Sequence, residues 1–525
     1  MVHADKRPLL DRCGIIAAFS PVDVPFFQTG LRGLQLLQTR GYDGAGFWAV
    51  DTHGASYSYK GMGMINEVFS PEILHLYGEI HARAWVYQVR YGTSGVSDQS
   101  NVQPFVMTHR KTGDAFVVAH NGQFSVSSST NAERASDTHR YATELSETNG
   151  RKWDERIVSS LLHKTGAWSL VIGTGHALYL ARDSWGFRPL VYGHVWKKEV
   201  NGYMWVVASE TSSLETMGAS DCFELMPGTI AKITSDGLKV LDHIATTKQA
   251  LCMFENVYIQ HGTGRAFLPR KSPRNIMRSP TVDDVRRRMG VILAREAPVS
   301  SNDVDMVMGI PGTGIEGGMQ FARALNIPYL QAITDKSRSH EEQRTFMTSS
   351  VNTIYQKVLD HFSFDAQTLK GRRVVLVDDS IVRGNITKGL IYLLREQYQV
   401  RSIHLRILCP PIDKPCHLGI STRSLIELIA ARHNGDVLAI QAELKADSLL
   451  YLSAAGLREA VTKDPRARGF CMGCMVGQMY PIDAYGRSTN HSTNGHRRVQ
   501  RPVMKVDIDI KKPIEPHKKS TFLYA

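Results

Sequence analysis

Several features that would assign this sequence of 525 residues to other classes of protein are missing. No uninterrupted apolar run approaches the ~18–20 residues that span a bilayer, and Met1–Arg12 lacks the apolar core of a secretory signal. We find no zinc-finger spacing and no aromatic–basic pattern of RNA-binding domains. No G-x-x-x-x-G-K-[ST] loop is present to hold a nucleoside triphosphate. We therefore expect a cytoplasmic protein that binds neither membrane nor nucleic acid.

The net charge of +12 does not change this expectation, because much of it lies in one stretch of the chain. Residues 484–525 contain nine Lys or Arg against three Asp or Glu, together with three prolines and a Ser-Thr-Asn segment. Such a composition is typical of a solvated basic tail. We therefore predict a basic C-terminal tail over 484–525 and assign no ligand to it.

The patterning of apolar residues differs between two parts of the remaining chain. From Cys13 to Ile244, short alternating and β-branched runs predict stacked antiparallel sheets, with one long helix pattern at Gly30–Gln38. After Val282, apolar strands alternate with helix patterns, which predicts βαβ units on a parallel sheet. A chain of this length has room for two or more domains, and we place them at 13–250 and 251–483.

One strand–loop–helix pattern in the second part is especially informative. Four branched apolar residues predict a buried strand, and Asp378 and Asp379 stand at its end. Ser380–Gly384 follow as a short loop that begins and ends with a small residue, and Thr387 opens a predicted helix. Ligands of open α/β sheets bind beyond the carboxyl ends of the strands, and the N–H groups of a helix N-terminus favour a phosphate. Because two acids beside such a loop suit a sugar diol, the pattern predicts a site for a phosphorylated ribose.

This pattern resembles the phosphoribosyl pyrophosphate (PRPP) signature of type I phosphoribosyltransferases. Its form is similar to that of the amidophosphoribosyltransferases, also called glutamine phosphoribosylpyrophosphate amidotransferases, which begin de novo purine synthesis. The resemblance implies an α/β phosphoribosyltransferase domain over 251–483. It also implies that PRPP and Mg²⁺ are bound by Asp378, Asp379, Ser380, Arg383, Gly384, Thr387 and, from a separate loop, Thr313.

An apolar strand pattern in the first part of the chain begins with Cys13. A buried structural thiol is the usual reason for such a cysteine, but further motifs change this interpretation. They follow in order as Arg40–Gly46, Val89–Gly95, Asn101–Phe105, His120–Gly122 and Ser136–Thr138. Together they resemble the motifs of class II, or N-terminal nucleophile, glutamine amidotransferases. The resemblance implies an αββα fold of stacked antiparallel sheets over 13–250.

The chemistry of an N-terminal cysteine agrees with this resemblance. A thiol with an ordinary pKa of ~8.5 is mostly protonated at neutral pH, whereas a free α-amino group with a pKa of ~7.7–8.0 can accept its proton. Both groups belong to one residue only if Cys13 is the first residue of the mature chain. We therefore predict that residues 1–12 form a propeptide that must be removed.

The resemblance also assigns roles to other residues of this part. It implies that Asn121 and Gly122 form an oxyanion hole through a side-chain amide and a backbone N–H. It implies that Arg90 holds the α-carboxylate of glutamine and that Asp137 holds its α-ammonium group. Gln88 stands where many relatives have His, next to the expected glutamine pocket, and none of these roles depends on it.

Four of the seven cysteines match a further family pattern. Disulfides are rare in the cytosol, and Cys471-x-x-Cys474 alone fits a redox pair, a zinc site or an incidental pair. In the iron–sulfur subgroup of the amidophosphoribosyltransferases, this pair is joined by two distant cysteines, which Cys252 and Cys416 match. The resemblance implies a [4Fe–4S] cluster held by four thiolates, and a zinc ion is the alternative.

Several segments in the second part depart from the family pattern. Tyr258–Gly262 replaces the family's Tyr-Phe-Ala-Arg-Pro, and Ile310–Gly314 lacks the acid of Val-Pro-Asp-Ser-Gly. Residues 334–343 replace Lys-Asn-Arg-Tyr, and Asn385–Ile386 replaces Thr-Thr. Within 334–343, Lys336 and Arg338 are candidate substitutes for the lost basic residues. These departures make the geometry of the PRPP loops the least predictable part of the chain.

Our leading hypothesis is an enzyme with glycosyltransferase and glutamine amidotransferase activity, which aminates PRPP to 5-phosphoribosylamine and releases glutamate and pyrophosphate. Because of the altered loops, an alternative hypothesis is a divergent paralogue that aminates another phosphorylated sugar. A non-catalytic subunit that senses PRPP is a further alternative, against which the retained Cys13, Arg90, Asn121 and Asp137 argue. We also expect a homo-oligomer, with purine nucleotides as candidate feedback ligands.

Overall fold

The structure is a computed structural model, which describes residues 13–91, 98–125, 135–244, 248–336, 358–420, 422, 424–483 and 487–489. The expected propeptide at 1–12 and Arg338 lie outside these ranges, as does the expected basic tail apart from 487–489. The division of the chain into domains at 13–250 and 251–483 stays a prediction.

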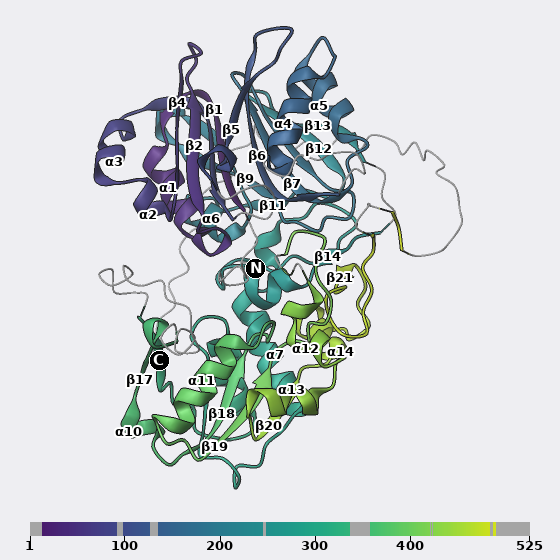
Figure 1. The fold of residues 1–525 in the computed structure, drawn as a ribbon. Coiled ribbons are helices and arrows are strands. Elements are labelled where there is room, and N and C mark those ends of the chain that lie inside the picture. The colour runs from purple at the N-terminus through teal and green to yellow at the C-terminus, as the bar shows by residue number, and fades with distance from the viewer. Residues whose placement is uncertain are drawn as a thin grey trace, which may run out of the picture. The chain divides into compact units, whose positions relative to one another are not determined.

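Two antiparallel sheets form the part of the chain that begins with Cys13 (Figure 1). The first has the strand order β11-β9-β10-β1-β4-β2-β3, with β1 (Gly14–Pro25), β2 (Gly44–Val50), β3 (Ser56–Met62), β4 (His81–Arg90), β9 (Val191–Lys197), β10 (Gly202–Ala208) and β11 (Cys222–Glu224). The second has the order β13-β12-β8-β7-β6-β5, with β5 (Phe105–Thr108), β6 (Ala115–Phe124), β7 (Gly166–Thr174), β8 (Leu178–Arg182), β12 (Thr229–Thr234) and β13 (Gly237–His243).

The two sheets pack face to face between layers of helices. Along β1, Ile15, Ala17 and Phe19 pack with Val117 and Val171 of the second sheet in one buried cluster. The alternate residues of β1 belong to a separate core on the other face of the first sheet. Helices of this part are α1 (Phe27–Gln35), α2 (Ile65–Val68), α3 (Pro71–Tyr77) and α6 (Thr211–Thr216) beside the first sheet, and α4 (Asp137–Glu147) and α5 (Trp153–Leu161) beside the second. This layering confirms the predicted αββα arrangement.

A parallel sheet dominates the second part of the chain. Its order is β15-β18-β19-β20, with β15 (Met306–Gly309), β18 (Arg373–Asp378), β19 (Ser402–Ile407) and β20 (Ser448–Tyr451). The helices that accompany it are α7 (Val282–Glu296), α8 (Gly314–Ala324), α10 (Ala366–Leu369), α11 (Asn385–Glu396), α12 (Ile429–Arg432), α13 (Val437–Leu444) and α14 (Ala454–Thr462). Because every strand pair of this sheet is parallel, the predicted βαβ architecture is confirmed.

Two small sheets and several short helical turns complete the described elements. Strand β14 (Leu251–Cys252) pairs in parallel with β21 (Phe470–Cys471), and β16 (Ile333–Asp335) pairs with β17 (Phe362–Phe364) in antiparallel fashion. The turns are η1 (Gln38–Arg40), η2 (Gln99–Asn101), η3 (Lys198–Val200), η4 (Glu255–Ile259), η5 (Ile276–Arg278) and η7 (Leu425–Glu427). None of the helices in the described ranges combines the length and the apolar character that a membrane span requires.

Candidate functional site

Cys13 lies directly before β1, which pairs with both β4 and β10 in the first sheet. Its side chain is buried. Burial raises the pKa of the Cys13 thiol, while the backbone of Tyr91, the charge of Arg90 and the side chain of Gln88 lower this pKa. The structure therefore brings Cys13 next to the end of β4, where the predicted glutamine ligand Arg90 and the unusual Gln88 both lie.

Asn121 and Gly122 lie next to each other on β6. Asn121 is completely buried, and neither Nδ2 nor Oδ1 of its amide has a hydrogen-bond partner among the described residues. Gly122 has a φ of +132°, and a Cβ at this position would lie 1.9 Å from the carbonyl oxygen of Ala167 on β7. Only glycine fits this close approach. A buried amide without a partner is rare in native proteins, and here it can donate to a bound ligand.

Asp137 begins α4 and ties this helix to the end of β6. Its carboxylate accepts hydrogen bonds from the backbone N–H groups of Thr138, at 2.8 Å, and Phe124, at 3.0 Å. Nδ1 of His120 lies 4.0 Å from the same carboxylate. Burial lowers the pKa of His120, and the charge of Asp137 opposes this decrease. The predicted ligand of the glutamine α-ammonium group is thus fixed beside the strand that carries Asn121.

Two residues of the Asn101–Phe105 motif hold this region together, a role that the sequence did not reveal. Gln103 accepts a hydrogen bond from the backbone N–H of His120 at 2.8 Å and donates one to Oγ1 of Thr138 at 3.2 Å. Oδ1 of Asn101 accepts a hydrogen bond from the backbone N–H of Ser136 at 2.8 Å. The motif marked both residues, but their partners are distant in sequence and became apparent only in the fold.

The predicted PRPP acids lie at the carboxyl edge of the parallel sheet. Asp378 ends β18, and the loop that follows the neighbouring strand β15 reaches the same place, where Oγ1 of Thr313 donates a hydrogen bond to Asp379. The hydroxyl of Ser380 also donates to Asp379. Burial and the charge of Asp379 raise the pKa of Asp378 well above its usual range. The structure therefore brings two further predicted residues, Thr313 and Ser380, next to the two crowded carboxylates.

The other predicted PRPP residues lie where the loop enters α11. Gly384 precedes the helix with a φ of +80°, and a Cβ there would lie 2.7 Å from Cδ1 of Ile429. Among the described residues, no side chain caps the helix at this end. Thr387 is buried in its first turn. The guanidinium of Arg383 forms an ion pair with Glu427 at 2.6 Å. The sequence pattern did not indicate this ion pair.

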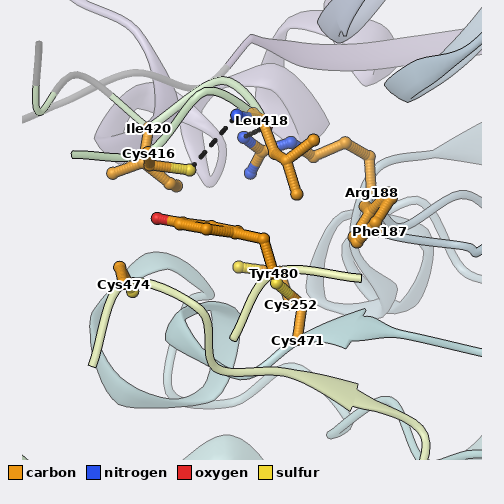
Figure 2. A pocket seen from close by; sticks show the side chains of 9 residues that line it. All are labelled: Phe187, Arg188, Cys252, Cys416, Leu418, Ile420, Cys471, Cys474 and Tyr480. Atoms are coloured by element: carbon orange, nitrogen blue, oxygen red, sulfur yellow. Dashed lines mark hydrogen bonds between the residues drawn. The ribbon is translucent and has the colours of Figure 1, made fainter. Parts of the chain in front are cut away.

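Cys252, Cys416, Cys471 and Cys474, which match the family pattern, line one pocket (Figure 2). In the small parallel sheet, Cys252 on β14 lies opposite Cys471 on β21. Burial raises the pKa of all four thiols, to about 11 for Cys252. The neighbouring cysteines raise the pKa values of Cys471 and Cys474 further. Four thiols from distant parts of the chain thus meet within electrostatic reach of one another.

Tyr480 was not singled out in the sequence, yet it occupies the middle of this pocket. Figure 2 shows its ring between Cys416 and the other three cysteines. Its hydroxyl donates a hydrogen bond to the carbonyl oxygen of Pro415 at 3.0 Å. Within the described ranges, no group of three or more His, Cys, Asp or Glu side chains is arranged to hold a metal ion.

Comparison with known proteins gives relatives that match along most of the chain, although no family model matches it. The chain is 32% identical over 484 residues to the amidophosphoribosyltransferase of Synechococcus elongatus, covering 90% of this chain and 92% of that protein. It is 30% identical over 493 residues to the Bacillus subtilis amidophosphoribosyltransferase, covering 92% of this chain and 96% of that protein.

Two solved structures resemble the chain over both of its parts. The glutamine PRPP amidotransferase from B. subtilis, complexed with ADP and GMP, has a TM-score of 0.75 at 28% identity and covers 91% of this chain and 99% of that one. A structure described as the allosteric regulatory enzyme of purine biosynthesis has a TM-score of 0.77 at 29% identity, covering 91% of this chain and 97% of that one. The likeness therefore includes the antiparallel sheets and the parallel sheet together.

Proposed function

The chain belongs to the amidophosphoribosyltransferase family, and we propose that it transfers the amide nitrogen of glutamine to C1 of PRPP. The products are 5-phosphoribosylamine, glutamate and pyrophosphate, in the first step of de novo purine synthesis. The observation that carries this proposal is that one chain holds two complementary arrangements: a buried cysteine beside Arg90 on the first sheet with a buried amide on the second, and two carboxylates at the edge of a parallel sheet. The relatives favour neither a different sugar substrate nor a non-catalytic sensor.

In the proposed glutaminase reaction, the sulfur of Cys13 attacks the amide carbon of glutamine. The thiol proton passes to the α-amino group of the same residue, which is free only after removal of residues 1–12. As the carbonyl oxygen gains charge, Nδ2 of Asn121 and the backbone N–H of Gly122 donate hydrogen bonds to it. The α-amino group then returns this proton to the amide nitrogen, the C–N bond breaks and releases ammonia, and water hydrolyses the thioester to glutamate.

Arg90 and Asp137 would hold the two ends of the glutamine backbone. A bidentate pair between the guanidinium of Arg90 and the α-carboxylate adds both energy and direction. The carboxylate of Asp137 would accept hydrogen bonds from the α-ammonium group. The influence of Arg90 on the Cys13 thiol supports this assignment, as does the attachment of Asp137 to the end of β6.

PRPP would bind at the carboxyl edge of the parallel sheet. Asp378 and Asp379 would accept hydrogen bonds from the ribose hydroxyls, and the N–H groups at the start of α11 would hold the 5-phosphate. Thr313 and Ser380, which both contact Asp379, border the same space. Arg383 could contact the substrate after leaving its ion pair with Glu427.

Magnesium fits this arrangement, because burial and the charge of Asp379 raise the pKa of Asp378, and a divalent cation beside the two carboxylates would offset both effects. Mg²⁺ is commonly held by one or two carboxylates, substrate phosphates and water. Asp378 and Asp379, together with the oxygens of PRPP, are thus a sufficient donor set. When bound, the ion would neutralise charge on the departing pyrophosphate.

The amination step joins the two sites. The lone pair of ammonia attacks C1 of the ribose, the bond from C1 to the pyrophosphate oxygen breaks, and the new amine loses a proton. Ammonium has no lone pair to donate, so the ammonia has to reach C1 without equilibrating with bulk water. This requirement explains why one chain carries both reactions.

We propose that Cys252, Cys416, Cys471 and Cys474 hold a [4Fe–4S] cluster. Four thiols that line one pocket are the donor set such a cluster uses. For a cluster to bind all four sulfurs, the ring of Tyr480 has to turn out of the space between them. A structural zinc ion, with the same four ligands, is the competing assignment. In either case the centre would crosslink segments that lie more than 200 residues apart along the chain, from Cys252 to Cys474.

Further features of the protein belong to the same proposal. We place the glutamine amidotransferase domain at 13–250, the phosphoribosyltransferase domain at 251–483, and a basic tail at 484–525. Purine nucleotides are proposed as feedback ligands, since the B. subtilis relative was solved with ADP and GMP. A homo-oligomeric state and a cytoplasmic location stay predictions.

Product analysis tests the proposed function directly. Purified protein that begins at Cys13 should release glutamate from glutamine, and should release pyrophosphate from PRPP only when glutamine or ammonia is supplied. Pyrophosphate release with another phosphorylated sugar but not with PRPP would favour the divergent paralogue. Absence of both glutamate and pyrophosphate would favour the sensor.

A further inference from the structure

The loop Ser380–Gly384, which we call the phosphate loop, carries an arginine that is already held by a carboxylate. Nε and Nη2 of Arg383 donate hydrogen bonds to the same oxygen of Glu427, at 3.1 Å and 2.6 Å. The hydroxyl of Ser424 donates to the other oxygen of Glu427 at 3.3 Å. The two charged side chains are 24% and 30% exposed, respectively. The ion pair is therefore oriented by its surroundings, but water still reaches it.

The backbone of the fold brings Glu427 to this place. Glu427 ends the turn η7, and two residues later the backbone N–H of Ile429 donates a hydrogen bond to the carbonyl oxygen of Val382 at 2.9 Å. On the other side of Arg383, a Cβ on Gly384 would lie 2.7 Å from Cδ1 of Ile429. The segment that carries Glu427 thus packs on the phosphate loop both before and after Arg383. The ion pair is a consequence of this packing and not only of two long side chains.

Arg383 directly precedes the end of α11 that is proposed to hold the 5-phosphate of PRPP. Among the described residues, no side chain caps this end, where Gly384 precedes the first helical residue, Asn385. The first N–H groups of a helix have no intrahelical partners and favour a phosphate. A phosphate bound by these N–H groups and by Arg383 would have to take the guanidinium from Glu427.

A phosphate monoester is a stronger partner for this guanidinium than a carboxylate. It carries a charge of about −1.5 to −2 at pH 7, and arginine often binds it through two parallel hydrogen bonds. A partly exposed ion pair contributes little net stability, so a phosphate dianion can displace the carboxylate. A monovalent anion, by contrast, carries no more charge than Glu427 and gains nothing from the exchange.

We propose that Glu427 is a positioning residue that sets the affinity and the anion selectivity of the PRPP site through Arg383. In the free protein, Glu427 holds the guanidinium that the 5-phosphate takes when PRPP binds. The released carboxylate then turns to solvent, and no covalent bond changes. Glu427 thereby lowers the affinity for PRPP and keeps monovalent anions off Arg383. This inference rests on the proposed PRPP site and on Arg383 as one of its ligands.

The test compares charge-neutralising variants that keep the shape of the side chain. Glu427→Gln removes the proposed competitor. Glu443→Gln is the matched control, because Glu443 pairs with Arg432 at 2.8 Å, with side chains that are 28% and 30% exposed. In the described hydrogen bonds, Glu443 contacts Arg432 and His433 but no residue of the phosphate loop. Arg383→Gln and the double variant Arg383→Gln/Glu427→Gln complete a double-mutant cycle.

Calorimetry with PRPP and Mg²⁺, without glutamine or ammonia, measures the affinity of each protein. Glu427→Gln should bind PRPP at least about threefold more tightly than the parent, since the ion pair no longer has to be broken, and Glu443→Gln should bind like the parent. Arg383→Gln should bind more weakly, and adding Glu427→Gln to it should restore no affinity. Between ~0.1 M and ~1 M chloride salt, the affinity of Glu427→Gln should fall more steeply than that of the parent, because chloride then reaches Arg383.

Three results would each overturn this inference. They are an unchanged affinity in Glu427→Gln, an equal gain in Glu443→Gln, and a gain that persists when Arg383 is also replaced, which would indicate a general effect of charge. Equal salt dependence in Glu427→Gln and the parent would overturn the selectivity. If the parent binds no PRPP, the proposed function itself fails, whereas PRPP binding that Arg383→Gln leaves unchanged refutes only this inference. Should Arg383→Gln not fold, the comparison of Glu427→Gln with Glu443→Gln decides the result.

Discussion

Replacement of Asn121 by Leu should raise stability and lower glutaminase activity at the same time. The amide of Asn121 is completely buried and has no hydrogen-bond partner among the described residues. Leaving such a group unsatisfied costs about 1–3 kcal/mol, and Leu has a similar volume without polar atoms. We therefore expect Asn121→Leu to increase the free energy of unfolding by about 1–2 kcal/mol.

The effect on catalysis should have the opposite sign. If Nδ2 of Asn121 donates to the developing oxyanion, its removal should reduce kcat for glutamine hydrolysis about 10²–10³-fold, as found for other oxyanion-hole donors. Thermal unfolding gives the stability change, since 1 kcal/mol shifts the midpoint by about 2–4 °C for a domain of this size. Glutamate release at saturating glutamine gives kcat.

Ammonia-dependent pyrophosphate release is the internal control for this variant. It should stay within about twofold of the parent, because the PRPP acids lie at the edge of a different sheet. Full glutaminase activity in this variant would contradict the assignment of Asn121 to the oxyanion hole. A variant that loses stability would show instead that the amide has a partner in the free protein.

Three further predictions address the remaining parts of the proposal. Cys13→Ala should abolish glutamate release and leave ammonia-dependent pyrophosphate release. N-terminal sequencing of the active parent should begin at Cys13. Active protein that retains residues 1–12 would refute the α-amino group of Cys13 as the base. The double change Asp378→Ala/Asp379→Ala should weaken PRPP binding at least tenfold, measured by calorimetry with Mg²⁺. Each lost acceptor leaves a ribose hydroxyl unpaired at a cost of ~1–3 kcal/mol, and ~1.4 kcal/mol corresponds to a tenfold change in affinity. Equal affinity in the double variant would place the PRPP site elsewhere. Anaerobically purified protein should be brown and contain about four irons and four sulfides, and Cys474→Ser should lose the iron and the sulfide. Colourless protein with stoichiometric zinc would identify a zinc site.

Local patterns predicted the elements that carry the proposed chemistry, but not their limits. The strand that ends at Asp378 and the strand that follows Cys13 are both present. Helix α11 begins at Asn385, two residues before the predicted Thr387, since the backbone turns at Gly384 and the N–H of Lys388 already donates to the Gly384 carbonyl oxygen at 2.8 Å.

The first helix shows the same kind of difference. Its apolar pattern was assigned to Gly30–Gln38, whereas α1 spans Phe27–Gln35. Phe27 belongs to the core beside the first sheet and draws the helix start towards it, and the residues from Gln38 to Arg40 form the separate turn η1. Tertiary burial of one aromatic side chain thus moved the helix by about one turn.

Contacts between distant residues were beyond what one sequence can give. Arg40 is separated by 170 residues from Glu210 and by 215 from Glu255, and no local spacing relates them. The only signal available in the sequence was that Arg40 stands in a family motif. Tyr480 carries no motif, and its place among the cysteines depends on how three distant segments meet.

Two of the departures from the family pattern fall where the fold uses backbone atoms. Relatives have Arg in the place of His261, but here Glu210 is bound by the backbone N–H of that residue, a contact that any residue except proline permits. Asn385 and Ile386 replace two threonines in the first turn of α11, where free N–H groups, rather than side chains, favour a phosphate. Ile310–Gly314 lacks an acid, yet its Thr313 still reaches Asp379. Because the side chains proposed for bond making and breaking are retained while these loops vary, the family reaction is compatible with every departure that the described residues include.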